Sequence, residues 1–356
     1  MASENTQQAK KLIVVVGATG NQGGSVARRF LQDPQYAVRG LTRNPESPAS
    51  KELAALGAEM VKAELEDVES LKAAFKGANV IFSVTQYWQP YSRPDCRAKA
   101  KELGVSIRQY AGMVELQHGR NIADAAATVV DTLVPNGFLV STLSHAGKCS
   151  NGRFTNLYHF DCKAEIFPDY VNEKYPELAA KMSCIHTGFF TTSHLILPDS
   201  YFKKDLLTRP QVADNTFEMR FPMRPDRPTW HLDVNHDLGN FVYAVSKMPP
   251  GKAYMAGEQR TWPEWAAAWA SVTGATITYK QVTREDMVNE TPDKDVGLEV
   301  AIMFEYSDDP GYDGGMELLT VEDLRKAGFD CPMSTLEESF RRQDFAYVLN
   351  KPIASS

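Results

Sequence analysis

The chain has 356 residues, 43% of them hydrophobic and 23% charged, which is ordinary for a globular protein. At roughly 150 residues per domain, this length predicts about two folding units. The formal net charge of −7 argues against a general affinity for nucleic acid. The polar N-terminal segment lacks the apolar core of a signal peptide, and no apolar run of about 18 residues predicts a membrane span.

The cysteines and histidines do not have the spacing of a ligand set. The five cysteines are Cys96, Cys149, Cys162, Cys184 and Cys331. An odd number without close pairs predicts neither a disulfide framework nor a zinc site. The seven histidines also lack a metal spacing. We therefore expect no metal, and reduced thiols in a cytoplasmic protein.

The first predicted elements surround a glycine-rich turn. Residues 12–16 form a short β-branched run, as in a parallel strand buried on both faces, and residues 25–31 predict a helix. Between them stands G-x-x-G-x-x-G, with Gly17 for the tight turn, Gly20 for close approach to a pyrophosphate and Gly23 for helix packing. Free N–H groups and the helix dipole favour phosphate at such a helix start. The turn predicts a dinucleotide site; the alternative is a plain glycine-rich connection.

The second predicted strand, Tyr36–Thr42, ends in Arg43 rather than in an acid. An acid at this place would accept hydrogen bonds from the ribose of NAD. A guanidinium instead suits the extra phosphate of NADP. We therefore expect NADP(H), with the alternative that Arg43 is a solvated loop residue.

Strands and helices continue to alternate along the first half. Further strands are predicted at 58–62, 79–84 and 137–143, and helices from residue 68 and at 121–132. This order predicts a parallel sheet with right-handed crossovers. Asp67 either contacts the adenine end of a dinucleotide or caps the next helix. The charged segment 90–119 is interpreted as a helix plus an inserted loop.

Several segments carry a resemblance to a known family. The segments are GATGNQGGSVARRFL, LTRNP, SVTQYW, YHFDCKAEIFPDYV and HTGFFTTSHL. They resemble the NmrA-like family of atypical short-chain dehydrogenase/reductase proteins, which includes fungal regulators, an NADPH-sensing animal protein and fungal biosynthetic oxidoreductases. The resemblance spans nearly the whole chain. It implies an α/β fold, with a Rossmann-type doubly wound parallel sheet and a smaller C-terminal α/β domain.

The resemblance also suggests domain limits and dinucleotide contacts. We place an NADP-binding domain at residues 1–160, joined by a strand around 181–192, and a smaller substrate domain, interleaved with it, at 161–356. The expected cofactor contacts are Gly17, Ala18, Thr19, Gly20, Asn21, Gln22, Gly23, Arg43, Asn44, Asp67, Thr85, Gln86, Lys148, Lys163, Phe189, Phe190, Thr191 and Thr192.

The usual catalytic pair of short-chain dehydrogenases is incomplete. Those enzymes place Tyr and Lys four residues apart on one helical face. Here His159 precedes Lys163 by four residues, and Tyr158 is one position off. In one interpretation Lys163 is the general acid or orients substrate, assisted by His159, Tyr158 or Ser144. In the other, Lys163 only holds the nicotinamide ribose and nothing turns over; for His159 itself, packing or capping is the simpler expectation.

The C-terminal half shows strand signals at 182–186 and 227–233 and a helix within 234–247. A capping-box-like Thr261 precedes three tryptophans at i, i+3 and i+7. We interpret these tryptophans as a buried helix face rather than an aromatic substrate wall. Thr320-x-x-Asp323 and Ser334-x-x-Glu337 predict two more helix starts.

The leading hypothesis is an NADP(H)-dependent oxidoreductase of a small organic substrate in a fungal secondary-metabolite pathway. It has no nucleic-acid or membrane partner. The rival is a non-catalytic NADP(H)-sensing regulator that binds a protein partner, with a nuclear location as well as a cytoplasmic one. The missing tyrosine favours this rival.

Overall fold

Seven parallel strands form the central sheet, in the spatial order β10-β6-β5-β4-β1-β2-β3. The computed structural model describes residues 9–204 and 215–349. The strands are β1 (Lys11–Val15), β2 (Tyr36–Thr42), β3 (Glu59–Lys62), β4 (Val80–Ser83), β5 (Phe138–Thr142), β6 (Met182–Thr187) and β10 (Ala253–Ala256). The strand order reverses between β1 and β4, and this switch point opens a crevice at the carboxyl ends of the strands. The predicted Rossmann-type sheet is confirmed.

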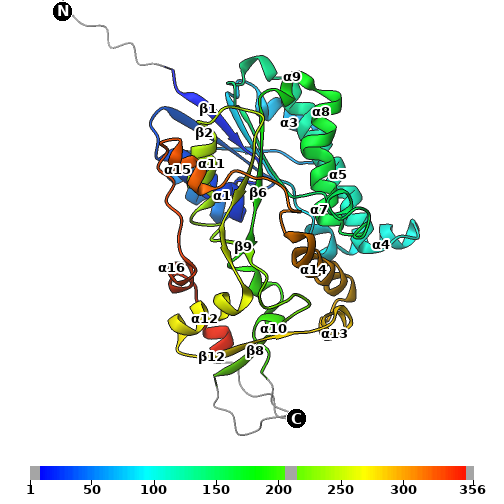
Figure 1. The fold of residues 1–356 in the computed structure, drawn as a ribbon. Helices are drawn as coiled ribbons and strands as arrows, with labels where there is room; N and C mark the ends of the chain where they lie inside the picture. The colour runs from blue at the N-terminus through cyan, green and yellow to red at the C-terminus, as the bar shows by residue number, and fades with distance from the viewer. Residues whose placement is uncertain (1–8, 205–214, 350–356) are drawn as a thin grey trace, which may run out of the picture.

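Helices cover both faces of this sheet (Figure 1). One face carries α1 (Asn21–Leu31), α2 (Pro48–Ala55), α11 (Leu238–Val245) and α15 (Val321–Lys326). The other carries α3 (Val68–Phe75), α5 (Ile107–Ala127), α7 (Tyr158–Ala164), η3 (Glu165–Tyr170), α8 (Val171–Lys174) and α9 (Pro176–Ala179). Ile13, Val14 and Val15 are fully buried because helices pack on both sides of β1.

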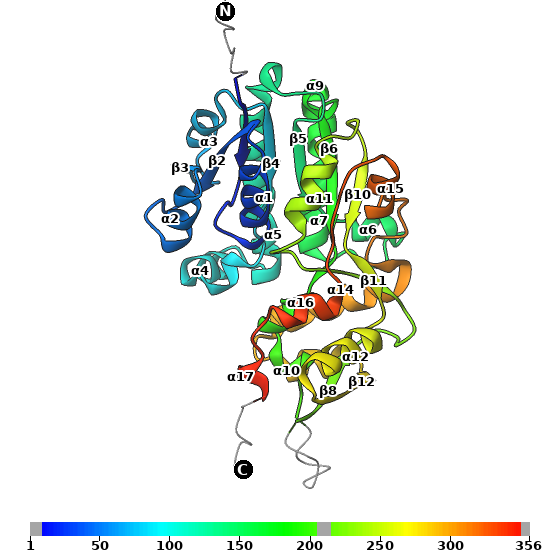
Figure 2. The ribbon, with the colours of Figure 1, turned by 90° about the vertical axis from the view of Figure 1, so that its left-hand side faces the viewer.

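A second, smaller lobe lies beyond the carboxyl ends of the strands (Figure 2). Its strands are β7 (Phe189–Phe190), β8 (Thr216–Phe221), β9 (Thr229–Leu232), β11 (Glu258–Arg260) and β12 (Thr276–Gln281). They form a β11-β9-β7 sheet and a parallel β12-β8 pair. The lobe's helices are α10 (Pro198–Tyr201), α12 (Trp262–Thr273), α13 (Arg284–Glu290), α14 (Lys294–Tyr306), α16 (Leu336–Arg341) and α17 (Ala346–Leu349). Shorter elements are η1 (Gln89–Ser92), α4 (Pro94–Glu102), η2 (Val130–Thr132), α6 (Ala146–Cys149), η4 (Ser193–Leu195) and η5 (Ser307–Gly311).

The chain passes between the two parts several times. After β6 it enters the lobe, returns to the sheet at α11 and β10, and returns again at α15. Residue 160, the predicted domain limit, lies inside α7. The division into residues 1–160 and 161–356 stays a prediction. Among the described residues, no helix has the length and apolarity needed to cross a membrane.

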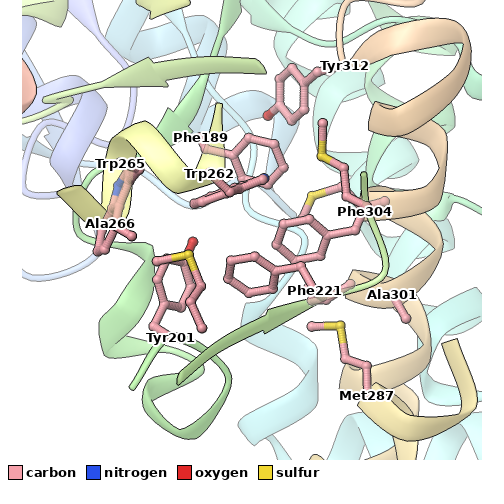
Figure 3. Close-up of a cluster of buried hydrophobic side chains, with 14 of the residues drawn as sticks. Phe189, Tyr201, Phe221, Trp262, Trp265, Ala266, Met287, Ala301, Phe304 and Tyr312 are labelled. Carbon is pink, nitrogen blue, oxygen red and sulfur yellow. The ribbon is translucent and has the colours of Figure 1, made fainter. Parts of the chain in front are cut away.

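Aromatic side chains fill the core of the lobe (Figure 3). Trp262, Trp265 and Trp269 are at most 1% exposed and face this core. The Thr261–Glu264 capping box is present at the start of α12. The predicted buried helix face is therefore confirmed.

Segment 90–119 differs from its prediction. Instead of a helix with an inserted loop it forms η1, α4 and the start of α5, a helix of 21 residues. The buried face of α5 contains Glu115, His118 and Gly119, and these residues interrupt its apolar period. The helical pattern was therefore hard to see in the sequence.

Two predicted helix starts also differ from the structure. Helix α1 begins at Asn21, four residues before the predicted start, because Gly20 is its extended N-cap. The last capping box is formed by Thr335 and Glu338 rather than by Ser334 and Glu337. Ser334 instead donates from its backbone and side chain to Asp237.

Two glycines of α5 test how tightly this helix packs. A Cβ on Gly119 would lie 2.3 Å from Ile166 Cδ1, whereas one on Gly112 would lie 3.4 Å from Tyr158 Cβ. We expect Gly119→Ala to lower the free energy of unfolding by about 1–3 kcal/mol through overpacking. Gly112→Ala, the control, should be neutral or stabilising by up to about 1 kcal/mol. Denaturant unfolding measures both, and equal effects would contradict this packing.

Candidate active site

A cleft of about 670 Å³ runs along the carboxyl ends of the strands and into the smaller lobe. Of the expected cofactor and catalytic residues, its lining includes Gly17, Thr19, Gly20, Asn21, Gln22, Gly23, Arg43, Asn44, Thr85, Gln86, His159, Lys163, Phe189 and Phe190. Other residues of the lining are Glu66, Trp88, His118, Leu143, Ile196, Leu197, Tyr201, Val300, Met303, Phe304 and Tyr312. One continuous cleft therefore joins the glycine-rich turn to the aromatic lobe.

The glycine-rich turn presents unpaired backbone amides. Gly17 has a φ of +64°, and a Cβ on Gly23 would lie only 2.3 Å from Gly17 O. The N–H groups of Asn21, Gln22 and Gly23 have no acceptor among the described residues, and α1 has no acid in its first turn. Such a helix start attracts an anion through its free donors and its dipole. The turn therefore fits the pyrophosphate of a dinucleotide.

Arg43 stands at the rim of the cleft just after β2. Its side chain is exposed, and no ion pair or hydrogen bond engages it within residues 9–204 and 215–349. The neighbouring Asn44 is fixed by its own turn, since its backbone N–H donates to Thr42 Oγ1 at 3.2 Å. An uncommitted guanidinium at this place can bind a ribose phosphate with two parallel hydrogen bonds.

The loop after β3 contributes Glu66 rather than Asp67 to the cleft. Asp67 caps α3 and accepts hydrogen bonds from the N–H groups of Glu69 and Ser70. Glu66 Oε1 lies 3.2 Å from Nε2 of His118, a buried residue of α5 whose pKa burial lowers. Glu66 and His118 thus form the wall at this end of the cleft.

Lys163 lies at the middle of the cleft and is held by a buried carboxylate. Its ammonium is ion-paired with Glu115 of α5, which is 0% exposed. Lys163 Nζ also lies 3.2 Å from Thr85 Oγ1, and that hydroxyl donates to Glu115 at 2.6 Å. The thiol of Cys162 donates to the second oxygen of Glu115 at 2.9 Å. Lys163 is therefore a cation held in a fixed position on the wall of the cleft.

His159 borders the cleft one helical turn before Lys163. Its Nδ1 lies 2.7 Å from Glu299 Oε1, and its backbone N–H donates to the same oxygen at 2.9 Å. Arg108 donates to Glu299 Oε2 at 2.8 Å. Burial would raise the pKa of Glu299, but His159 and Arg108 together hold it below its ordinary value. Glu299 is thus an ionised carboxylate in the core.

The far end of the cleft is apolar. Helix α14 contributes Val300, Met303 and Phe304, and Phe189 stacks on Phe304 with ring centroids 5.3 Å apart. Figure 3 shows Trp262 in the middle of the aromatic cluster, with Phe189 and Tyr201 on either side of it and Phe304 and Tyr312 nearby. Among the described lining residues of the smaller lobe, none is charged. This end suits an uncharged, apolar ligand.

Six residues that were expected to contribute lie outside the cleft lining. Ala18 is buried, and its N–H donates to Leu41 O. Lys148 is ion-paired with Asp169, and Thr191 bonds to Ser339 and Gln343. The remaining ones are Asp67, Thr192 and Tyr158, whose ring packs near Gly112. Ser144, a suggested helper, is buried against Tyr306. Any cofactor or catalytic role for these residues stays a prediction.

Glu115 and Glu299 were missed in the sequence analysis. Glu115 shares one helical face with buried Ala111 and Ile122. An acid at a position where the helical repeat predicts an apolar residue is the signal in the sequence that could have indicated a buried functional carboxylate. Glu299 lies among buried residues of α14 in the same way. Its partner is 140 residues away in the chain, and no local pattern indicates that contact.

No group of acids, histidines or cysteines able to hold a metal ion occurs among the described residues. The donors that the cleft does offer include free amides, an arginine and a lysine. They match a dinucleotide with its pyrophosphate and ribose groups.

Comparison with known proteins gives consistent matches. The NmrA-like family profile matches residues 9–340. An NmrA-like family domain-containing oxidoreductase of Aspergillus flavus is 46% identical over 291 residues, or 77% of this chain and 76% of the relative. Another, from Aspergillus hancockii, is 46% identical over 108 residues, which is 30% of this chain and only 32% of the relative's length.

Among solved structures, NmrA, a negative transcriptional regulator in complex with NADP, has a TM-score of 0.68 at 20% identity. The superposition covers 98% of this chain and 99% of that one. At this identity the likeness shows the shared fold.

Removing the guanidinium of Arg43 tests the choice between the two nicotinamide cofactors. We expect Arg43→Ala to weaken NADP(H) binding roughly 10- to 100-fold, because it removes charge-assisted hydrogen bonds worth about 1.5–3 kcal/mol. NAD(H) binding should change little. Lys51→Ala, which removes a nearby exposed cation paired with Glu46, is the control. Calorimetry measures both cofactors, and equal weakening of the two would refute the assignment.

Proposed function

The chain belongs to the NmrA-like family, and from this premise we propose that it is an NADP(H)-dependent oxidoreductase of an uncharged small organic molecule. The observation that carries the proposal is the continuous cleft. Its one end offers free amides and Arg43, and its other end is an apolar pocket, with Lys163 between them. A cofactor alone does not need the second pocket.

In this proposal the dinucleotide lies across the carboxyl ends of the strands. The amides of α1 bind the pyrophosphate, Arg43 binds the 2′-phosphate, and Lys163 binds the nicotinamide ribose. Bound there, the nicotinamide supplies or accepts a hydride. Thr85 and Glu115 keep the Lys163 ammonium fixed, so the ribose meets a preorganised donor.

The pocket in the smaller lobe supports an apolar substrate class. Phe189, Phe304 and Tyr312 line this pocket with aromatic carbon, and the Phe189–Tyr312 ring centroids lie 4.6 Å apart. An aromatic or conjugated carbonyl compound would stack on these rings and bury its apolar surface, while water is excluded from its reacting end. An anionic substrate would find no cationic partner among the described residues of this pocket.

The relatives support a fungal setting. Those reported above are named oxidoreductases and come from Aspergillus species. We therefore propose a place in a fungal secondary-metabolite pathway, with a cytoplasmic location.

A second candidate is a non-catalytic sensor of NADP(H) that binds a protein partner. Its support is the likeness to NmrA, whose structure is described as that of a negative transcriptional regulator. The absence of tyrosine four residues before Lys163 also favours it. The apolar pocket favours the enzyme, because binding NADP(H) alone does not require a second, apolar pocket.

Loss of NADPH absorbance in the presence of aromatic ketones, enones and quinones separates the two candidates. We expect steady oxidation with at least one class, and a loss of roughly 100-fold when Lys163→Met is combined with Glu115→Gln. The double variant avoids a buried unpaired charge. Lys99→Met, an exposed lysine paired with Glu102, is the control. Tight NADPH binding with no oxidation across the panel would reject the enzyme and favour the sensor.

A further inference from the structure

The imidazole of His159 is fixed at one nitrogen only. Nδ1 lies 2.7 Å from a carboxylate oxygen of Glu299, and a carboxylate can only accept. Nδ1 therefore carries the proton, and in the neutral ring the lone pair is on Nε2. The backbone N–H of His159 donates to the same oxygen, which fixes the ring's position as well as its tautomer.

Arg108, rather than His159, supplies the positive charge that balances Glu299. Arg108 donates to its other oxygen at 2.8 Å, and the guanidinium also donates to Asn156 O at 2.6 Å. Side chains of Arg108 and Glu299 are 7% and 0% exposed, so their charges offset each other within the core. His159 can therefore gain and lose a proton without leaving Glu299 unpaired.

The second nitrogen of His159, Nε2, has no hydrogen-bond partner in the described part of the chain and is not fully buried. The ring borders the cleft beside Trp88, with centroids 5.1 Å apart. Lys163 follows four residues later on the same helical face. Nε2 thus lies on the ligand side of α7, near the expected nicotinamide ribose.

The surroundings of His159 leave few other proton donors. Among the described residues, the charged or titratable groups around it include Glu299 and Asp295 on α14, Arg108 and Glu115 on α5, Cys162 and Lys163 on α7, and Tyr87 and Tyr91 after β4. Burial raises the pKa of Tyr87 and of Tyr91, and their hydroxyls bond to each other at 2.9 Å. These phenols stay neutral and their hydroxyls are engaged with each other, whereas Nε2 of His159 has no hydrogen-bond partner among the described residues.

We propose that His159 is the proton donor and acceptor of the redox reaction, with Glu299 and Arg108 as positioning residues. This inference rests on the proposed oxidoreductase function. In the reducing direction the substrate carbonyl carbon gains a C–H bond from hydride, and the C=O π electrons move to oxygen. That oxygen takes the proton from Nε2, which leaves the neutral imidazole protonated at Nδ1. Solvent returns the proton through the cleft; oxidation runs through the same atoms in reverse.

Nitrogen NMR of the cofactor-free protein, labelled at histidine, tests the geometry without turnover. His159→Gln assigns the signals by their loss. We expect wild-type His159 to be protonated at Nδ1 when neutral, and to titrate at Nε2. In Glu299→Gln the titration should move to lower pH, because a negative charge is lost. The proposal would be overturned if the neutral ring carried its proton at Nε2. It would also be overturned if Glu299→Gln left the pH of the His159 transition unchanged.

Kinetics with a turned-over carbonyl compound tests the chemistry. We expect His159→Gln to lower kcat roughly 100-fold, with NADPH affinity changed less than about threefold. Glu299→Gln should lower kcat less and shift the pH profile of kcat in step with the NMR titration. The control is His145→Gln, because His145 also faces a carboxylate, Asp161 at 2.9 Å, but lies outside the cleft lining.

The possible failures are distinguishable. If wild-type protein oxidises NADPH and His159→Gln keeps its kcat and pH profile, the proton-transfer role is refuted and the oxidoreductase function stands. If wild-type protein binds NADPH but reduces nothing, the oxidoreductase function fails, and the proton-transfer role fails with it even where the NMR result agrees.

Discussion

Two buried glutamates hold α7 at the cleft, and the candidate chemistry depends on this constraint. A helix of seven residues has little stability of its own. Glu115 from α5 binds Lys163, and Glu299 from α14 binds His159, so α7 is anchored near both of its ends through charged contacts. Removing one partner of a buried ion pair typically costs about 3–5 kcal/mol. Since α14 belongs to the smaller lobe, the same contact ties that lobe to the sheet.

The two ends of the cleft are built by different means. At the glycine-rich turn the binding groups are backbone amides, and their positions follow from the strand-turn-helix geometry and from Gly17 and Gly23. At the far end the groups are side chains of α14, β7 and α10. Backbone recognition can be shared across a family of related folds, whereas side-chain recognition sets which substrate enters. Such a division would allow one cofactor to be combined with different substrates.

Local signals predicted the first part of the fold well. The strand, glycine turn and helix near Gly17, the β2 strand before Arg43, and the capping box at Thr261 all depend on neighbours in sequence. Glu299 could not be paired with His159 in this way, because that contact joins α14 to α7. Segment 90–119 was misread for a related reason: polar Glu115 and His118 lie on the buried face of α5, where tertiary partners compensate them.

The most direct test of this account is a crystal structure of the protein with NADP⁺ bound. We expect phosphate oxygens on the amides of Asn21, Gln22 and Gly23, the 2′-phosphate on Arg43, and the nicotinamide ribose within hydrogen-bond distance of Lys163. The nicotinamide ring should then face the pocket formed by Phe189 and Phe304. A dinucleotide bound away from α7, or with its nicotinamide end outside that pocket, would contradict the account.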